Sequence, residues 1–571
     1  MMGQIYTKAN ACLIWLSDGG TLAIEVIQRL QKGWFSIPDG EPIYQIDVIQ
    51  TNIRPAITNL HPEQSLAVFD FLSLSWFSRI WVLQEVILAK KVVAMCGSKI
   101  IRFQPIIHFG HVLMTCDAFA DIGVCARKCR DIGYSGFLQI QKACSALRLM
   151  FVSNSQLNKE GTSLDITFTY AMELYATDDK DKIYGILGLA RSSANFASRI
   201  TVDYTLTADR VYPSATVAIA KSDETLNILT RVCDPRRRKY RGLPSWCPDY
   251  TVSSTLSQSG MTVPVIWGNT LRPVIESSSD SLTLTVEGIR FDAIYNMTDR
   301  PEPWQNVPDV PDAYTLLVEI VALTTTLDFK TPSRVTSLWG LLMGPFLHKA
   351  AKYPPNVEYL VFPTVLIGLF LVAVQESWSR GVGSDPHAEI FTLMDSLASL
   401  QRSVHTLSQL EPENILFLPD TRILAEARKV VLEKNEGALE AFLYSLMEVD
   451  LLLRAKKAGL EKDLLALVGI QSSVVSKQTL WELLQSYIAK TTAQVGVKLA
   501  REVRYFTSSN LQLIGFGDGR IDERCEIWIL HGCQLPVLLR RKGESHYEFC
   551  GTANVCGSLQ TDGTITRINL V

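Results

Sequence analysis

The 571-residue sequence lacks a dominant charge, a long membrane-compatible segment and an N-terminal export signal. Its 55 Lys and Arg residues nearly balance its 58 Asp and Glu residues. No broad basic surface for nucleic-acid phosphates is therefore expected. The N-terminus shows no basic region followed by an apolar stretch and a small-residue cleavage site. We expect a cytoplasmic protein without a nucleic-acid partner, whose 12 cysteines are mostly reduced.

One apolar run, residues 359–374 (YLVFPTVLIGLFLVAV), comes closest to a membrane segment. A helix of this length spans about 24 Å, which is short of the roughly 30 Å of bilayer hydrocarbon. The flanking residues Glu358 and Glu376 are acidic, and no basic anchor stands close by. The run therefore predicts a buried core helix and argues against a membrane span.

Familiar catalytic and metal-binding patterns are also missing, since no Gly-x-Ser-x-Gly, Walker A or His-Glu-x-x-His motif occurs. The stretch Gly515–Gly519 precedes a β-rich segment without a following helix, so it predicts a turn. His108 and His111 have helical spacing, with Cys116 nearby, but no fourth ligand stands at a supporting distance. We expect neither a metal nor another cofactor.

The first hundred residues alternate between strand and helix patterns, which is typical of an open α/β unit. Ala11–Leu16 is almost continuously apolar, and this favours a strand buried on both faces of a parallel sheet. Helical apolar spacing follows in Thr21–Lys32, Glu63–Leu74 and Arg79–Lys90. Val92–Cys96 predicts another strand.

The rest of the chain changes character twice. Residues 101–300 form a mixed, mainly helical region with an ordered turn around Trp246 and a helix-to-strand passage over 219–232. Period-two alternation over 282–294 predicts a strand pair or one long strand. Its basic run, residues 236–241, predicts a solvated loop. Residues 301–500 have a helical pattern. Residues 501–571 are rich in Gly and β-formers, and they predict a small antiparallel barrel or sandwich. The fold class is therefore α+β.

Four motif segments stand in fixed order along the first half of the chain. They are Gly3–Leu16 (GQIYTKANACLIWL), Trp76–Gly97 (WFSRIWVLQEVILAKKVVAMCG), Thr177–Leu189 (TDDKDKIYGILGL) and Gly242–Tyr250 (GLPSWCPDY). Together they closely resemble the fungal heterokaryon-incompatibility (HET) family, whose members trigger cell death when genetically different hyphae fuse. The resemblance implies a role in allorecognition and programmed cell death, exerted through protein partners.

The resemblance also concerns the beginning of the chain. HET domains normally start upstream, with Leu-Ser-Tyr-x-Trp-Gly-like and Trp-Ile-Asp-x-x-Cys-Ile-Asn-Gln-like strands that do not occur here. The resemblance thus implies a truncated, Rossmann- or TIR-like HET α/β domain over residues 1–100. Ala11–Leu16 would then be an unpaired apolar edge that invites self-association into a homo-oligomer. A decayed, inactive copy is the alternative.

Arg79 and Glu85 are the candidate catalytic residues. In an Arg79–Lys90 helix, Trp81 and Glu85 share one face, and a carboxylate beside an indole can be desolvated enough for acid–base work. The favoured interpretation is structural, with Arg79 and Glu85 tying the helix to loops while Trp81 fills the core. HET domains have been likened to TIR domains, so an NAD-cleaving enzyme remains the alternative function.

The remaining motif positions point to structure. The resemblance marks the motif residues Gln84, Asp181, Lys182, Gly185, Trp246 and Asp249. The acidic cluster Asp178, Asp179 and Asp181 is interrupted by lysines and lacks the calcium-loop pattern. It is therefore predicted to cap the following helix.

Overall fold

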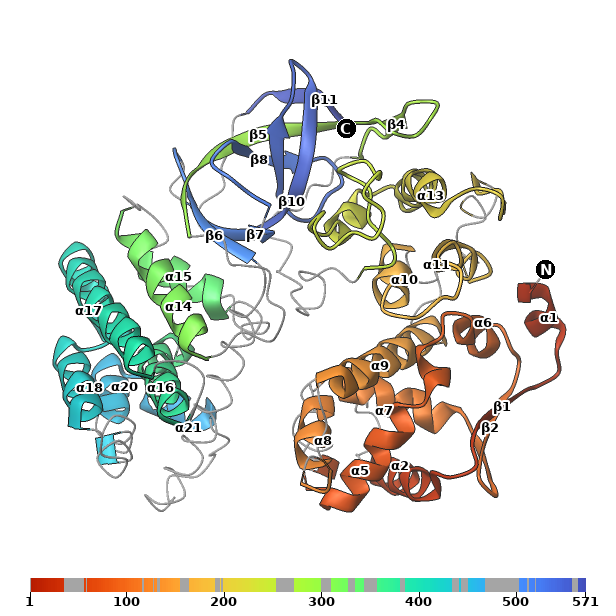
Figure 1. The fold of residues 1–571 in the computed structure, drawn as a ribbon, viewed down its shortest axis with the longest axis horizontal. Helices are drawn as coiled ribbons and strands as arrows, with labels where there is room; N and C mark the ends of the chain where they lie inside the picture. The colour runs from red at the N-terminus through yellow and green to blue at the C-terminus, as the bar shows by residue number, and fades with distance from the viewer. Residues whose placement is uncertain are drawn as a thin grey trace. The chain divides into compact units, whose positions relative to one another are not determined.

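The computed structural model combines helices and strands in an α+β fold, as the sequence predicts (Figure 1). It describes residues 2–34, 56–57, 59–115, 118–126, 128–130, 134–154, 164–189, 196, 199–252, 272–298, 310–326, 334–343, 357–379, 386–433, 441–442, 450–467, 503–510, 513–518, 520–556 and 563–571. The chain divides into two compact units. Unit 1 comprises Met1–Ser254 and Ile275–Leu284, and unit 2 comprises Thr255–Val274 and Thr285–Val571.

Unit 1 contains a three-stranded sheet in the order β1-β2-β3. Strand β1 (Cys12–Ser17) runs parallel to β2 (Val92–Cys96), and β2 runs antiparallel to β3 (Lys99–Arg102). Gly97, with φ of 57°, makes the tight turn between β2 and β3. The two strands expected from the sequence are thus confirmed, and β3 is an addition.

The expectation that β1 is buried on both faces is wrong. Its burial alternates, with Ile14 and Leu16 buried while Leu13 and Trp15 are 64% and 58% exposed. The register places Trp15 opposite Met95, and Met95 opposite Ile100, which is 66% exposed. Within the described part of the chain, the core therefore covers one face of this sheet, and the other face presents apolar side chains.

Helices make up most of unit 1. They are α1 (Met2–Lys8), α2 (Thr21–Trp34), α5 (Pro62–Leu72), the 3-10 helix η2 (Ser75–Ser78), α6 (Val82–Ile87), α7 (Gln104–Thr115), α8 (Ala118–Ala126), α9 (Tyr134–Asn154), α10 (Leu164–Ala171), α11 (Asp181–Tyr184), α13 (Ala208–Asp223) and the 3-10 helix η3 (Asn227–Arg231). Helix η3 replaces the strand expected before Val232. Its N–H groups are satisfied locally, for example Leu229 by Leu226 O at 3.0 Å, so no neighbouring strand is needed.

Unit 2 contains a closed barrel, which decides between the two expected β architectures. Its strands are β5 (Leu284–Met297), β6 (Val503–Ser508), β7 (Ile514–Asp518), β8 (Cys525–Leu530), β9 (Val537–Arg541), β10 (His546–Cys556) and β11 (Ile565–Leu570); the short β4 covers Glu276–Ser277. Antiparallel pairing runs β5-β6-β7-β10-β9-β8 and returns from β8 to β5, while β11 adds to β10 in parallel. Figure 1 shows β5, in green, among the blue C-terminal strands.

Strand β5 pairs with both β8 and β6, and a bulge interrupts each of these pairings. Irregularities lie at Arg290/Asp292 and at Ile294/Asn296, and such bulges increase local bending and twist. The Asp292 carboxylate, which is buried, accepts hydrogen bonds from the Asn510 backbone N–H (3.0 Å) and the Ser509 hydroxyl (2.8 Å). The turn after β6 is thereby fixed against the middle of β5.

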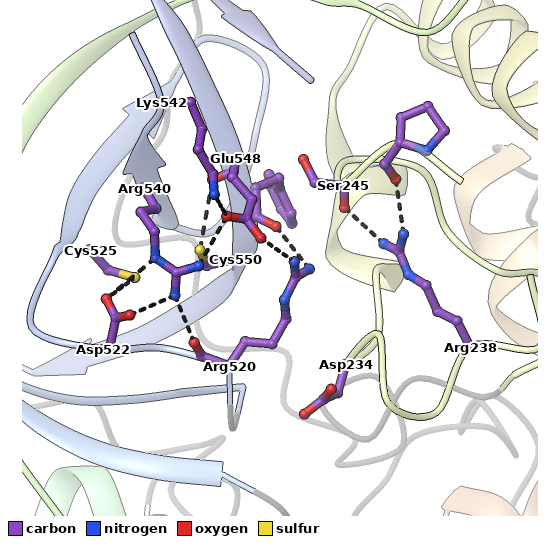
Figure 2. Close-up of polar contacts among 12 residues, drawn as sticks. Asp234, Arg238, Ser245, Arg520, Asp522, Cys525, Arg540, Lys542, Glu548 and Cys550 are labelled. Atoms are coloured by element: carbon purple, nitrogen blue, oxygen red, sulfur yellow. Dashed lines mark hydrogen bonds and ion pairs between the residues drawn. The ribbon is translucent and has the colours of Figure 1, made fainter. Parts of the chain in front are cut away.

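Charged side chains span three neighbouring barrel strands (Figure 2). The register aligns Cys525 with Arg540, and Arg540 with Glu548. Arg540 bonds Asp522 at 2.9 Å and Glu548 at 3.0 Å, while Arg520 bonds the other Glu548 oxygen at 2.6 Å. Burial alone would raise the pKa of Glu548, but Lys542 and these two arginines hold it below its usual value. The network therefore ties β8, β9 and β10 together.

The helical region is inserted between β5 and β6, two adjacent strands of the barrel. Its helices are α14 (Val310–Thr325), α15 (Arg334–Met343), α16 (Val357–Ser379), α17 (Pro386–Leu410), the 3-10 helix η5 (Pro412–Phe417), α18 (Thr421–Glu433), α20 (Leu452–Ala458) and α21 (Glu461–Leu467). The apolar run lies in α16, and its described side chains are buried almost all round. Of the helices the structure describes, none is both long and apolar enough to cross a membrane.

Two buried charged side chains fix the packing of this helical region. Arg454 of α20 pairs with Asp450 at 2.5 Å and donates to Leu360 O (3.2 Å) and Thr364 Oγ1 (2.8 Å) of α16. The Glu411 carboxylate accepts the backbone N–H of Arg334 at 2.6 Å and so caps the start of α15. Each group bonds a helix that is distant in sequence, which makes these contacts tertiary rather than local.

We predict that Arg454→Leu lowers the free energy of unfolding by about 3 kcal/mol, because it leaves the Asp450 carboxylate largely buried without its cation. Urea unfolding followed by circular dichroism at 222 nm measures this loss. The control is Arg428→Leu on the exposed side of α18, which is expected to change stability by less than about 0.5 kcal/mol. Equal effects of the two substitutions would contradict the prediction.

Candidate functional site

The motif segments singled out in the sequence meet inside unit 1. The indole Nε1 of Trp81 donates to Oδ2 of Asp181 at 3.1 Å. The carboxamide Nε2 of Gln84 donates to the carbonyl of Gly185 at 2.7 Å. These two bonds join residues that are 100 and 101 positions apart along the chain. They fasten the segment around α6 to the segment around α11.

Gln84 is the point at which three of the motif segments converge. Its side chain is 2% exposed. A Cβ at Gly188 would stand 3.2 Å from its Cδ, and one at Gly3 would stand 3.5 Å from its Oε1. Glycine at position 188 thus allows the turn after α11 to pack directly on the amide. At Gly3 the tighter contact of a Cβ would be with Leu88 Cδ1 at 3.3 Å, whereas its distance from the amide is an ordinary contact.

Asp181 is buried and uses both carboxylate oxygens. Besides Trp81, it accepts a hydrogen bond from the Tyr204 hydroxyl at 2.6 Å. Burial and this carboxylate raise the pKa of Tyr204, so the phenol stays protonated and keeps donating. Asp181 is the first residue of α11, so an aspartate does stand at the helix N-terminus as expected, but its side chain makes no cap hydrogen bond and bonds two other segments instead.

The other aspartates of the cluster also differ from expectation, because α11 has no side-chain cap. Asp178 Oδ1 accepts the Lys180 N–H at 3.0 Å in a local turn. Asp179 accepts hydrogen bonds from the Tyr240 hydroxyl at 2.5 Å and from the Lys239 ammonium. Burial on its own would raise the pKa of Asp179, but these hydrogen bonds hold it below its ordinary value. Asp179 therefore connects the third motif segment to the loop before the fourth.

The fourth segment, Gly242–Tyr250, folds around the fully buried carboxylate of Asp249. Its Oδ2 accepts the backbone N–H groups of Lys239 (2.8 Å) and Tyr240 (3.1 Å), while Oδ1 accepts the Thr251 hydroxyl at 2.6 Å. The buried Trp246 donates its indole N–H to Leu282 O at 3.2 Å. Both motif residues thus hold loop backbone in place.

The basic run before this segment is not simply a solvated loop. Arg238 is buried and donates to the carbonyls of Pro244 (3.0 Å) and Ser245 (2.8 Å), as Figure 2 shows. Arg236 pairs with Asp234 at 2.6 Å. A planar guanidinium can bond several carbonyls that a turn leaves without partners. The spacing of residues in the sequence could not show whether Arg238 is buried and bonds these carbonyls or is exposed to solvent.

Arg79 and Glu85 do not share a helix. Helix α6 covers only Val82–Ile87, whereas Arg79 is extended, with φ of −88° and ψ of 136°. A short bridge explains the break, since Ile80 N donates to Tyr175 O at 2.9 Å and Tyr175 N donates to Ser78 O at 2.6 Å. The expected Arg79–Lys90 helix is therefore wrong at both ends, since the helix begins at Val82 and ends at Ile87.

The indole beside Glu85 belongs to Trp76 rather than to Trp81. Trp76 Nε1 donates to Oε2 of the half-buried Glu85 at 3.3 Å. Tyr6 and Cys12 are close enough to sense this carboxylate, because burial and the charge of Glu85 raise the pKa of both groups. Neither Tyr6 nor Cys12 was predicted from the sequence. A raised thiol pKa keeps Cys12 neutral, so it is not activated as a nucleophile.

Lys182 is a buried cation of the same region. Its ammonium donates to Met172 O at 2.9 Å and to Leu174 O. Burial lowers the pKa of Lys182 to about 8. The charge is thus used to hold the turn that follows α10.

The candidate metal residues are placed as core or lie outside the described residues. The His111 ring stacks on Phe151 with centroids 3.8 Å apart, and burial lowers its pKa to about 3. Cys116 lies outside the described residues. Within the described ranges, no group of three or more His, Cys, Asp or Glu side chains gathers in a metal-binding arrangement.

Comparison with known families supports the assignment that the motifs indicated. Residues 1–85 match the family model "Heterokaryon incompatibility protein (HET)". The matched range, which contains Trp81, Gln84 and Glu85, is therefore similar to this family. No curated protein and no solved structure gave a significant match. The motif segments at 177–189 and 242–250 lie outside the matched range, but hydrogen bonds link the first of them to it directly.

We predict that Lys182→Met lowers stability by about 1–3 kcal/mol at pH 7, because the carbonyls of Met172 and Leu174 lose their donor. The folded-state pKa of about 8 lies below the ordinary value of 10.5. Between these values the unfolded chain binds more protons, so the lysine's contribution to stability rises with pH. The stability difference between wild type and variant is therefore expected to widen as pH rises.

Urea unfolding at pH 7.5 and pH 10 tests this prediction. A stability difference that stays constant or narrows at the higher pH would show that burial does not lower the pKa of Lys182. The control is Lys221→Met in the last turn of α13, where the lysine is not fully buried. It is expected to change stability little at either pH.

Proposed function

We propose that this protein acts in fungal heterokaryon incompatibility, in the allorecognition that leads to cell death, and that it acts in the cytoplasm through protein contacts. One observation carries the proposal. The motif side chains that define the HET resemblance are engaged in bonds that hold the fold together, as in Trp81–Asp181 and Gln84–Gly185. Side chains engaged in this way stabilise the fold, and the fold in turn exposes surfaces for contacts with other proteins.

The sheet of unit 1 supports action through protein contacts. Leu13, Trp15 and Ile100 are each more than half exposed and lie on the same face. Among the strands that the structure describes, β1 also stands at one edge of this sheet. Apolar side chains beside an open strand edge are features of surfaces that associate with other chains.

Deletion of the gene in the producing fungus tests the role. Hyphae of the deletion strain and its parent are paired with a panel of genetically different tester strains, and the viability of fused cells is scored with a vital dye. We expect the deletion to raise fused-cell survival with at least one tester. A reintroduced wild-type gene is expected to restore death. Unchanged survival across the panel would favour the decayed-copy alternative and contradict the proposal.

The alternative function, NAD cleavage, rests on Glu85, a half-buried carboxylate with Trp76 and Tyr6 beside it. Because Glu85 accepts an indole hydrogen bond and no activated nucleophile accompanies it, we predict that the purified protein releases no nicotinamide from NAD above background. Chromatography of the reaction products measures this. Release that Glu85→Gln abolishes, and that the matched control Glu63→Gln on α5 leaves intact, would establish the enzyme instead.

A further inference from the structure

A depression at one end of the β2–β3 pair gathers positive charge. It encloses about 480 Å³, and its lining includes Lys90, Lys91, Arg102 and Gln104, together with the apolar Val86 and Ala89. Among the residues that the structure describes, no Asp or Glu belongs to the lining. The volume lies within the usual range of small-molecule sites, roughly 300–1,000 Å³.

The strand register brings the three cations together. Lys90 and Lys91 directly precede β2, and Arg102 ends β3. In the antiparallel pair, Val93 stands opposite Arg102, and the Phe103 N–H donates to Val92 O at 3.2 Å. The start of β2 and the end of β3 are therefore neighbours, so residues that are 11 or 12 positions apart meet on one rim.

These cations differ from others in unit 1 in lacking a counter-charge. Lys99 pairs with Glu25, and Arg130 pairs with Asp70. Lys90, Lys91 and Arg102 are exposed, and among the residues that the structure describes none forms an ion pair with them. Three like charges around a concave surface repel one another and focus a positive potential that an anion would relieve.

We propose that this depression binds the phosphate group of a small phosphorylated molecule. Arg102 offers a planar fork of donors that suits phosphate oxygens, and the two lysines add point charges. Val86 and Ala89 supply an apolar wall for the rest of such a molecule. A local depression in a chain of net charge −3 does not suit an extended nucleic acid, which needs a basic stripe. The proposal is independent of the role in heterokaryon incompatibility.

Calorimetric titration of the full-length protein with pyrophosphate tests this site. We expect saturable binding at low ionic strength that weakens as NaCl is added. Lys90→Gln, Lys91→Gln and Arg102→Gln are each expected to weaken binding about fivefold, and the triple variant is expected to abolish it. Lys128→Gln is the matched control, because it removes an exposed lysine outside the depression and should leave binding unchanged.

Two further measurements separate the outcomes. Thermal unfolding of each variant checks that the fold is intact, which is expected because the substituted side chains are exposed. Sedimentation with vesicles that contain phosphorylated inositol lipids tests a membrane source of phosphate. The proposal is overturned if wild-type protein does not bind pyrophosphate, if the triple variant binds as well as wild type, or if only the vesicles bind.

Discussion

The buried carboxylate of Asp181 forms the interaction on which the packing of unit 1 depends. It receives the indole N–H of Trp81 and the phenol of Tyr204, so three separate stretches of chain share one acceptor group. A buried carboxylate is tolerated only when hydrogen bonds replace its lost hydration. Removing either donor would leave one oxygen of the Asp181 carboxylate without a hydrogen bond. This explains why Trp81, Asp181 and Tyr204 depend on one another.

Around Asp181, buried polar side chains repeatedly form the hydrogen bonds with backbone groups that a helix or sheet would otherwise supply. Asp249 bonds three loop residues, Arg238 bonds loop carbonyls, and Lys182 bonds two more. Buried loop backbone requires such partners, since its own N–H and C=O groups have no ladder or helix to join. The motif residues therefore specify how irregular segments pack, and this use leaves the exposed sheet face and the cationic depression as the surfaces available to other molecules.

The sequence predicted the regular elements better than it predicted their partners. Apolar spacing located α2 and α5, and the strands β1 and β2 were placed within a residue or two because short apolar runs were bounded by turn residues. It overextended the helix at Arg79, because the bridge to Tyr175 that unwinds the first turn is a tertiary contact. It also paired Glu85 with the wrong indole, because the indole N–H of Trp81 bonds Asp181, which is 100 positions away, and Trp76 bonds Glu85 instead. Tyr6 and Cys12 gave no signal, because nothing local marks a residue that folds back on a carboxylate some 70 to 80 positions away.

The insertion of the helical region into the barrel has a consequence for synthesis. Strand β5 ends at Met297, and its ring neighbours β6 and β8 begin at Val503 and Cys525. At ~5–20 residues per second, a ribosome needs about 10–40 s to make the intervening ~200 residues. Throughout that interval β5 lacks its barrel neighbours β6 and β8, while the helices after it can already pack on one another. In the nascent chain, β5 therefore stays outside the unfinished barrel during this interval. In the same period chaperones can bind this segment, or it can aggregate.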